Sequence, residues 1–166
     1  NFDAISLMPT NLYGPGDNYH PQNSHVMAAL IRKFYEASQN SQKSVICWGT
    51  GSPYREFLHA EDLGDAVVYA LENWDPDSNN APLDKDGKPL TILNVGTGKD
   101  ISIKSLAHKI AKFSDYKGDI LWDSSKPDGT PKKQLQVDKI LELGWKPKIS
   151  LDEGIISTIK NFAKNK

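Results

Sequence analysis

Short apolar runs spaced along the chain predict strands, and the segments between them have the spacing of amphipathic helices. Each run has the length of a strand, and its apolar residues either alternate with polar ones or follow one another directly. The predicted strands are 2–8, 44–48, 55–59, 90–98 and 119–123. Strands that alternate with helices predict an α/β fold in which at least some strands pair in parallel.

Three segments repeat apolar residues at steps of three and four, which is the spacing of one helix face. The stripes are Val26, Met27, Leu30, Ile31, Phe34 and Tyr35; Leu63, Val67, Ala70 and Leu71; and Ile103, Leu106, Ile110 and Phe113. We expect Ser24 or Asn23 to cap the first of these helices and Ser102 to cap the third. Two short helices are predicted at 138–144 and 151–165.

Three polar segments interrupt this pattern. Residues 9–26 are dense in proline, glycine, asparagine and histidine, which predicts a loop. Residues 75–89 contain almost no apolar side chains, so we expect a flexible loop there. Residues 124–133, SSKPDGTPKK, predict a turn at Pro-Asp-Gly with a basic exit, in a position suited to a flap over a ligand. With these loops, residues 1–166 are expected to form a single α/β domain.

Composition narrows the classes of function. The 166 residues include 20 basic and 21 acidic side chains, so the net charge of −1 gives no reason to expect nucleic acid or an anionic membrane as a partner. No apolar run approaches the roughly 20 residues that cross a bilayer. Cys47 is the only cysteine, which excludes an internal disulfide and a cysteine-rich zinc site. We therefore expect a cytoplasmic protein without a metal site.

The beginning of the chain and its missing motifs indicate part of a longer protein. Asn1 is not a methionine and leads directly into a strand-like run, so we expect further chain upstream. The sequence contains neither a G-x-G-x-x-G turn nor a G-x-x-x-x-G-K loop. It therefore has no dinucleotide-binding turn or P-loop of its own.

Four blocks carry a resemblance to a known family: PTNLYGPGDNYHPQNSHV, WGTGSPYREFLHAEDL, LNVGTG and SKPDGTPKK. With them the chain resembles the C-terminal half of the GDP-L-fucose synthases, epimerase/reductases of the extended short-chain dehydrogenase/reductase family. The resemblance implies the substrate-binding part of that fold, without the N-terminal Rossmann half that binds NADP. It also implies that the catalytic Ser, Tyr, Lys and Cys lie outside this chain, that the isolated chain is inactive, and that the parent enzyme is a homodimer.

The resemblance assigns contacts with NADP(H) to the loop that follows the first strand. The implied cofactor-binding residues are Pro9, Thr10, Asn11, Leu12 and His25. A strand end with proline and asparagine offers a ligand backbone and amide groups of fixed direction, which fits this assignment. The plain alternative is a turn whose polar groups satisfy only one another.

His25 is the candidate catalytic residue. Inverting a carbon next to a ketone removes a proton from one face and returns it from the other, which suits groups that titrate near neutrality. The resemblance implies that His25 is an acid in this step; the alternative is a histidine that bonds the backbone at a helix start. We interpret His20 as structural and Cys47 as a buried strand residue.

The resemblance implies four substrate-binding residues: Lys33, Trp48, Arg55 and Lys133. Arginine binds two phosphate oxygens at once and an indole packs against a base or sugar, so these residue types suit a GDP-sugar. Solvated lysines and a tryptophan of the core are the plain alternatives. The family often carries arginine at the position of Lys33, so this chain is expected to hold its ligand less firmly there.

The resulting hypothesis is the substrate-binding part of an NADPH-dependent enzyme that converts GDP-4-keto-6-deoxy-D-mannose to GDP-L-fucose. Two alternatives stay open from the sequence. One is a related sugar-nucleotide 4-epimerase or dehydratase with the same fold. The other is a non-catalytic module that binds a nucleotide sugar.

Overall fold

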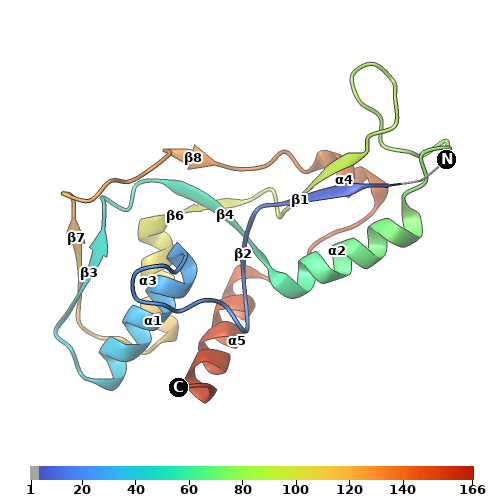
Figure 1. The fold of residues 1–166 in the computed structure, drawn as a ribbon. Coiled ribbons are helices and arrows are strands. Elements are labelled where there is room, and N and C mark those ends of the chain that lie inside the picture. The colour runs from blue at the N-terminus through green and yellow to red at the C-terminus, as the bar shows by residue number, and fades with distance from the viewer. Residues whose placement is uncertain (1–3) are drawn as a thin grey trace.

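The computed structural model describes residues 4–166, in which short strands and helices alternate along the chain (Figure 1). The strands are β1 (Ser6–Pro9), β2 (Asn11–Tyr13), β3 (Ser44–Trp48), β4 (Tyr54–His59), β5 (Ile92–Val95), β6 (Asp100–Ser102), β7 (Asp119–Asp123) and β8 (Lys132–Lys133). The helices are α1 (Val26–Gln39), α2 (Ala60–Asn73), α3 (Ile103–Phe113), α4 (Asp138–Leu143) and α5 (Leu151–Lys164). The predicted α/β class is confirmed.

The described strands form three small sheets. β1 pairs in parallel with β5, and β3 pairs in parallel with β7. The remaining sheet joins β2, β4 and β6, with β8 added in parallel along β4. In Figure 1 the β3–β7 pair lies at one end of the molecule and the β1–β5 pair at the other, with β4 between them. The long strand β4 therefore connects the two ends.

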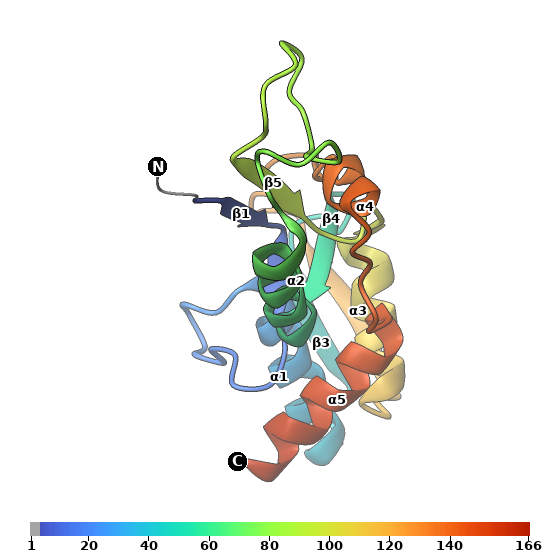
Figure 2. The same cartoon turned by 90° about the vertical axis from the view of Figure 1, so that its right-hand side faces the viewer.

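Two hydrophobic clusters hold these sheets and helices together. The larger cluster lies among α1, α3 and α5, and its fully buried side chains include Phe34, Ile110 and Ile155. The smaller one joins α2 and α4 to the β1–β5 pair around Leu58 and Trp145. Figure 2 shows α3 and α5 at the lower end of the molecule, and α4 beside β5 at the upper end. Burial of these apolar surfaces is the main stabilising term of each end.

The predicted apolar stripe of α2 is only partly buried, because two of its members, Val67 and Leu71, are exposed. Leu71 is 74% exposed and Val67 is also exposed, whereas the buried face consists of Asp62, Ala66 and Ala70. Asp62 is buried because its carboxylate accepts hydrogen bonds from the backbone N–H groups of residues 148 and 149. Small alanines let the helix approach its neighbours closely, and the larger apolar residues are left on the outside.

Three short strands were not predicted, because two or three residues show no alternation. β2 lies inside the predicted loop 9–26, β6 follows the predicted strand 90–98, and β8 lies at the end of the loop 124–133. The cap of α1 was also predicted wrongly, since the N-cap is His25 and its side chain makes no cap hydrogen bond. Ser102 caps α3 as predicted, accepting a hydrogen bond from the N–H of Ser105.

Residues 75–89 form a loop that projects beyond the β1–β5 pair (Figures 1 and 2). An isolated bridge pairs Leu83 with Pro89, and the side chain of Asp84 accepts hydrogen bonds from two backbone N–H groups within the loop. The loop is therefore confirmed, and its flexibility stays a prediction. Of the first predicted strand, residues 1–3 lie outside the described part of the chain.

None of the helices in residues 4–166 is both long enough and apolar enough to span a membrane.

Candidate functional site

The segment from Pro9 to Leu12 crosses from one sheet to the next and is fixed by internal hydrogen bonds. The N–H of Thr10 donates to the carbonyl of Val95 at 3.0 Å. The Asn11 amide donates to the carbonyl of Glu56 at 2.8 Å, and the Thr10 hydroxyl donates to the same oxygen at 3.3 Å. Pro9, at the carboxyl end of β1 where α/β folds hold their ligands, is left exposed, and so is Leu12 on β2.

His25 ends the loop that precedes α1, and its exposed side chain makes no cap hydrogen bond. Its backbone carbonyl accepts the N–H of Ala29 at 2.9 Å, so the start of the helix holds the residue through its main chain. His20 differs, because its Nδ1 accepts hydrogen bonds from the N–H groups of Gln22 and Asn23, each at 3.2 Å. His20 therefore supports the loop, and the imidazole of His25 is presented to solvent.

A cavity of about 260 Å³ lies between α1 and β3; we call it the α1–β3 cavity. Two predicted substrate residues, Lys33 and Trp48, line it, and so do Ser24 and Val26 on either side of His25. Cys47 also reaches the wall; it is buried, as predicted, and burial raises the pKa of its thiol. The fold therefore brings the neighbours of His25 to the same hollow as the predicted lysine and tryptophan.

Trp48 is an exposed aromatic surface flanked by cations. Its side chain is 64% exposed, although the residue before it on β3, Cys47, is buried. The ammonium groups of Lys33, from α1, and Lys126, from the loop after β7, each lie 5.6 Å from the centre of its ring. Cations at this distance interact with an aromatic face. Trp48 and the lysines offer a flat ring with positive charge beside it.

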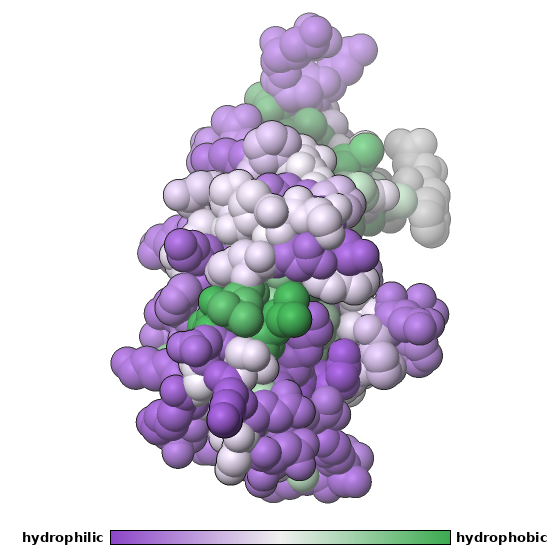
Figure 3. Space-filling view, turned by 90° about the vertical axis from the view of Figure 1, so that its left-hand side faces the viewer, coloured by the Kyte–Doolittle hydropathy of each residue, from purple (hydrophilic) through white to green (hydrophobic). Residues whose placement is uncertain are grey.

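The surface around Trp48 is also apolar. Ile46 and Leu121 are exposed and are register partners on β3 and β7, so their side chains lie on one face. Figure 3, which views the molecule from the side of this strand pair, shows an apolar patch near its centre. Lys33 donates a hydrogen bond to the carbonyl of Ile46 at 2.9 Å, and partial burial lowers its pKa. The lysine is thus held against the edge of this surface.

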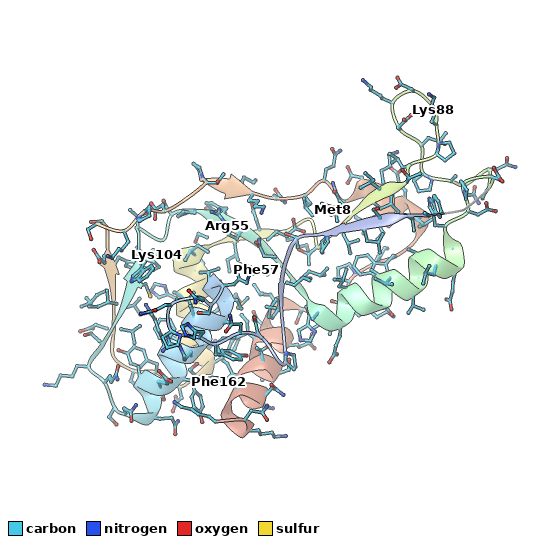
Figure 4. The ribbon with its side chains drawn as sticks, in the orientation of Figure 1. Met8, Arg55, Phe57, Lys88, Lys104 and Phe162 are labelled. Carbon is cyan, nitrogen blue, oxygen red and sulfur yellow. The ribbon has the colours of Figure 1, made fainter. Side chains whose placement is uncertain are left out.

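Arg55 and Lys133 form a second pair of predicted substrate residues. They are register partners in the parallel pairing of β4 and β8. One guanidinium nitrogen of Arg55 donates to the carbonyl of Tyr54 at 2.7 Å. In the view of Figure 4, Arg55 on β4 lies between Lys104, near the β3–β7 pair, and Met8 on β1. The turn 49–53 connects β4 to Trp48, so three of the four predicted substrate residues lie on β3, β4 and β8, and the fourth, Lys33, lies on α1.

Glu56 is a buried hub that sequence reasoning missed. Its fully buried carboxylate accepts hydrogen bonds from the N–H groups of Thr97 at 2.6 Å, Gly98 at 2.8 Å and Leu135 at 2.9 Å. A Cβ at Gly96 would collide with this carboxylate, so the glycine is required there. The Glu56 carboxylate thus joins the segments at 97–98 and 135 to β4, next to Arg55. The feature of the sequence that could have revealed this role is a carboxylate directly before the apolar residues Phe57 and Leu58 of β4.

Within the described part of the chain, no cluster of three or more histidine, cysteine, aspartate or glutamate side chains is arranged to hold a metal ion.

These parallel strands, their helices and the cavity beside β3 form the C-terminal part of the extended short-chain dehydrogenase/reductase fold. The chain belongs to the NAD dependent epimerase/dehydratase family, whose sequence profile matches residues 1–83. It is 49% identical over 164 residues to a probable GDP-L-fucose synthase 1 of Oryza sativa subsp. japonica, a match that covers 99% of this chain and 46% of the rice protein. The chain thus spans about half the length of this relative.

Solved structures of related GDP-sugar enzymes share the fold of this chain. A GDP-6-OMe-4-keto-L-xylo-heptose reductase from C. jejuni superposes with a TM-score of 0.85 at 33% identity, over 98% of this chain and 54% of that protein. A GDP-L-fucose synthetase from Naegleria fowleri bound to NADP superposes with a TM-score of 0.81 at 27% identity, over 97% of this chain and 47% of that protein. The predicted resemblance and the fold class are confirmed, whereas the roles of individual site residues stay predictions.

Proposed function

We propose that this chain is the substrate-binding half of an NADPH-dependent 3,5-epimerase/4-reductase that converts GDP-4-keto-6-deoxy-D-mannose to GDP-L-fucose. One observation carries the proposal. The α1–β3 cavity combines Lys33 and the exposed Trp48 with Ser24 and Val26, the two neighbours of His25. The chain that carries this cavity belongs to the NAD dependent epimerase/dehydratase family and is 49% identical to a relative named as a probable GDP-L-fucose synthase.

In this proposal the nucleotide end of the substrate lies along β3 and β4. The exposed face of Trp48 packs against the guanine base or a sugar, since an indole offers a flat apolar surface. Arg55 and Lys133 bind the diphosphate, and Lys33 adds a cation at the wall of the cavity. The plain alternative for Trp48, a tryptophan of the core, fits poorly with its exposed ring.

The hexose end of the substrate lies toward His25. In each epimerisation a base, proposed to be the cysteine of the N-terminal half, takes the proton next to the ketone, and the resulting enolate carbon then receives a new proton from the opposite face. The imidazolium of His25 donates that proton to the carbon, because its side chain is exposed and makes no cap hydrogen bond to the helix. The helix start holds its main chain and so fixes the point from which the ring reaches the substrate.

NADP(H) is proposed to lie beside Pro9 and Leu12 and to contact His25, with most of the cofactor held by an N-terminal Rossmann half. The exposed Pro9 at the end of β1 and the exposed Leu12 on β2 fit a planar ring of the cofactor, whereas the side chains of Thr10 and Asn11 fix the segment between the strands. When bound, NADPH supplies the hydride that reduces the ketone. We further propose that the whole enzyme is a cytoplasmic homodimer.

The N-terminal half is proposed to dock on apolar surface that the described chain leaves exposed. Met8 is 53% and Ile92 is 57% exposed on the outer face of the β1–β5 pair, and Val68 and Leu71 are exposed on α2. Among residues 4–166, β1 and β5 have only each other as strand partners. Exposed apolar residues beside open strand edges are typical of an interface.

The test of this function is turnover by the full-length enzyme. We expect it to oxidise NADPH in the presence of GDP-4-keto-6-deoxy-D-mannose and to release GDP-L-fucose, identified by chromatography and mass spectrometry. Solvent deuterium should enter the product at carbons 3 and 5, since both are reprotonated. Reduction without deuterium at these carbons would contradict the epimerase part, and a product formed without NADPH consumption would favour a simple epimerase.

A further inference from the structure

One carboxylate ties the loop between β7 and β8, residues 124–131, to the turn between β3 and β4. Oδ1 of Asp128 accepts the N–H of Thr50 at 2.7 Å, and Oδ2 accepts the Thr50 hydroxyl at 2.7 Å. The hydroxyl oxygens of Thr50 and Ser52 lie 2.8 Å apart and extend the contact. The hydrogen bond from the Thr50 side chain is the main cause that lowers the pKa of Asp128. We call this contact the Asp128–Thr50 clasp.

Glycines on both sides of the clasp allow this close approach. Gly49 has φ 78°, and a Cβ there would collide with the carboxylate of Asp128. Gly129 has φ 73°, and a Cβ there would lie 3.5 Å from a guanidinium nitrogen of Arg55. The loop therefore passes directly over the β3–β4 turn on one side of Asp128 and beside Arg55 on the other.

The clasp holds the middle of a loop whose ends carry cations. Near its beginning, the N–H of Lys126 donates to the carbonyl of Asp123 at 3.1 Å, and the ammonium of Lys126 faces the Trp48 ring. At its end, the N–H of Tyr54 donates to the carbonyl of Pro131 at 2.8 Å, and β8 then sets Lys133 opposite Arg55. Between these two points the bonds from Thr50 fix the loop to the turn.

We propose that Asp128 is a positioning residue for the nucleotide site. By clasping Thr50 it keeps the loop 124–131 closed beside Trp48 and Arg55, and it thereby sets where Lys126 and Lys133 meet the diphosphate. Asp128 acts through these cations and does not itself contact the nucleotide. The inference rests on the proposed function, because it takes the α1–β3 cavity and Arg55 as the site of the GDP group.

The experiment measures GDP binding by calorimetry, and kcat and KM for the keto-sugar nucleotide, in the full-length enzyme. Asp128→Ala should raise the Kd for GDP about tenfold and raise KM similarly, with kcat little changed. Asp128→Asn should restore affinity, because its amide oxygen accepts the Thr50 N–H and its amide nitrogen donates to the Thr50 hydroxyl. Thr50→Val should weaken binding, and combining it with Asp128→Ala should add little. Asp86→Ala, in the loop 75–89, is the matched control and should leave Kd unchanged.

Hydrogen–deuterium exchange of the backbone amides in the loop 124–131 provides a readout that is independent of the ligand. Exchange should be faster in Asp128→Ala than in the wild type and in Asp128→Asn, because the loop is released. An unchanged Kd in Asp128→Ala overturns the proposal, and so does an Asn variant as weak as the Ala variant. A wild type that does not bind GDP contradicts the proposed function; the clasp is then tested by the exchange rates alone, and equal rates in Asp128→Ala and the wild type overturn it.

Discussion

His25 combines an exposed imidazole with a main chain fixed at the start of α1. His25→Gln in the full-length enzyme should lower kcat by about 10²–10⁴-fold, since a positioned acid contributes about that much, while GDP affinity stays unchanged. Steady-state kinetics and calorimetry together measure the two effects. His108→Gln is the matched control, because this histidine is exposed on α3, where its ring bonds a carbonyl of its own helix. A kcat within a few-fold of wild type in His25→Gln would remove His25 from the mechanism.

Arg55, the register partner of Lys133 in the pairing of β4 and β8, is the arginine that we propose to bind the diphosphate. Arg55→Ala should weaken GDP binding by about 1.5–3 kcal/mol, the usual contribution of a charge-assisted hydrogen bond, which corresponds to about 10–150-fold in Kd. Arg55→Lys should recover only part of this loss, since lysine cannot bind two oxygens in the same plane. Calorimetry with GDP measures the change, and Lys160→Ala on α5 controls for loss of positive charge. Equal affinity in Arg55→Ala and wild type would make Arg55 a purely structural residue.

At the scale of single residues, the sequence was informative where chemistry shows in the residue type. The family resemblance assigned Trp48 and Lys33 to a substrate site, their aromatic and cationic side chains suit that assignment, and both residues line the same cavity. Glu56 was missed because its role depends on three N–H groups from segments 41 and 79 residues away. Which distant donors meet a carboxylate is decided by tertiary packing, and no local pattern records it.

At the scale of elements, α5 begins with a capping box that links Ser150 and Glu153. The Ser150 side chain accepts the N–H of Glu153, and the Glu153 carboxylate accepts the N–H of Ser150 at 3.1 Å. Ser150→Ala should destabilise the start of this helix by about 0.5–2 kcal/mol. Hydrogen–deuterium exchange of the α5 amides measures it, with Ser124→Ala in the exposed loop after β7 as the control. Exchange as slow as in the wild type would show that packing alone holds α5.

The same capping box makes a pH-dependent contribution to the stability of the folded chain. The hydrogen bonds from Ser150 lower the pKa of Glu153 in the folded chain, and its unfolded pKa is ordinary, near ~4.3. The contribution is therefore fully present above that ordinary value and is lost as the pH falls through the lowered folded pKa. Glu153→Gln should melt below the wild type at neutral pH, and the difference should vanish in acid. A difference in melting temperature that persists in acid would assign the effect to packing instead.

Elements with a clear repeat were predictable, and those without one were not. The bounds of β3 and β7 agree with the apolar runs 44–48 and 119–123, because five residues suffice to show a strand pattern. β6 and β8 consist of three and two residues, and they form only because β4 offers both of its edges. The apolar spacing of α2 includes Val67 and Leu71, which are exposed. Such spacing shows that a helix has an apolar face, but it does not show whether that face packs in the core or is left for an interface.

At the scale of the whole molecule, the proposal that an N-terminal half docks on the outer face of α2 and on the open β1–β5 pair can be tested by recombining two separate chains. We expect the chain and a separately produced N-terminal half to associate, and NADPH oxidation with the keto-sugar nucleotide to require both. Burying an apolar side chain contributes about 1.5–3 kcal/mol, so Leu71→Asp on α2 should weaken the association more than tenfold. Leu83→Asp is the matched control, because Leu83 is an exposed leucine in the projecting loop 75–89. Titration by calorimetry, followed by the activity of the mixture, measures both effects. Turnover by the 166-residue chain alone would refute the proposed need for both halves. If Leu71→Asp and Leu83→Asp weakened the association equally, the interface would not include α2.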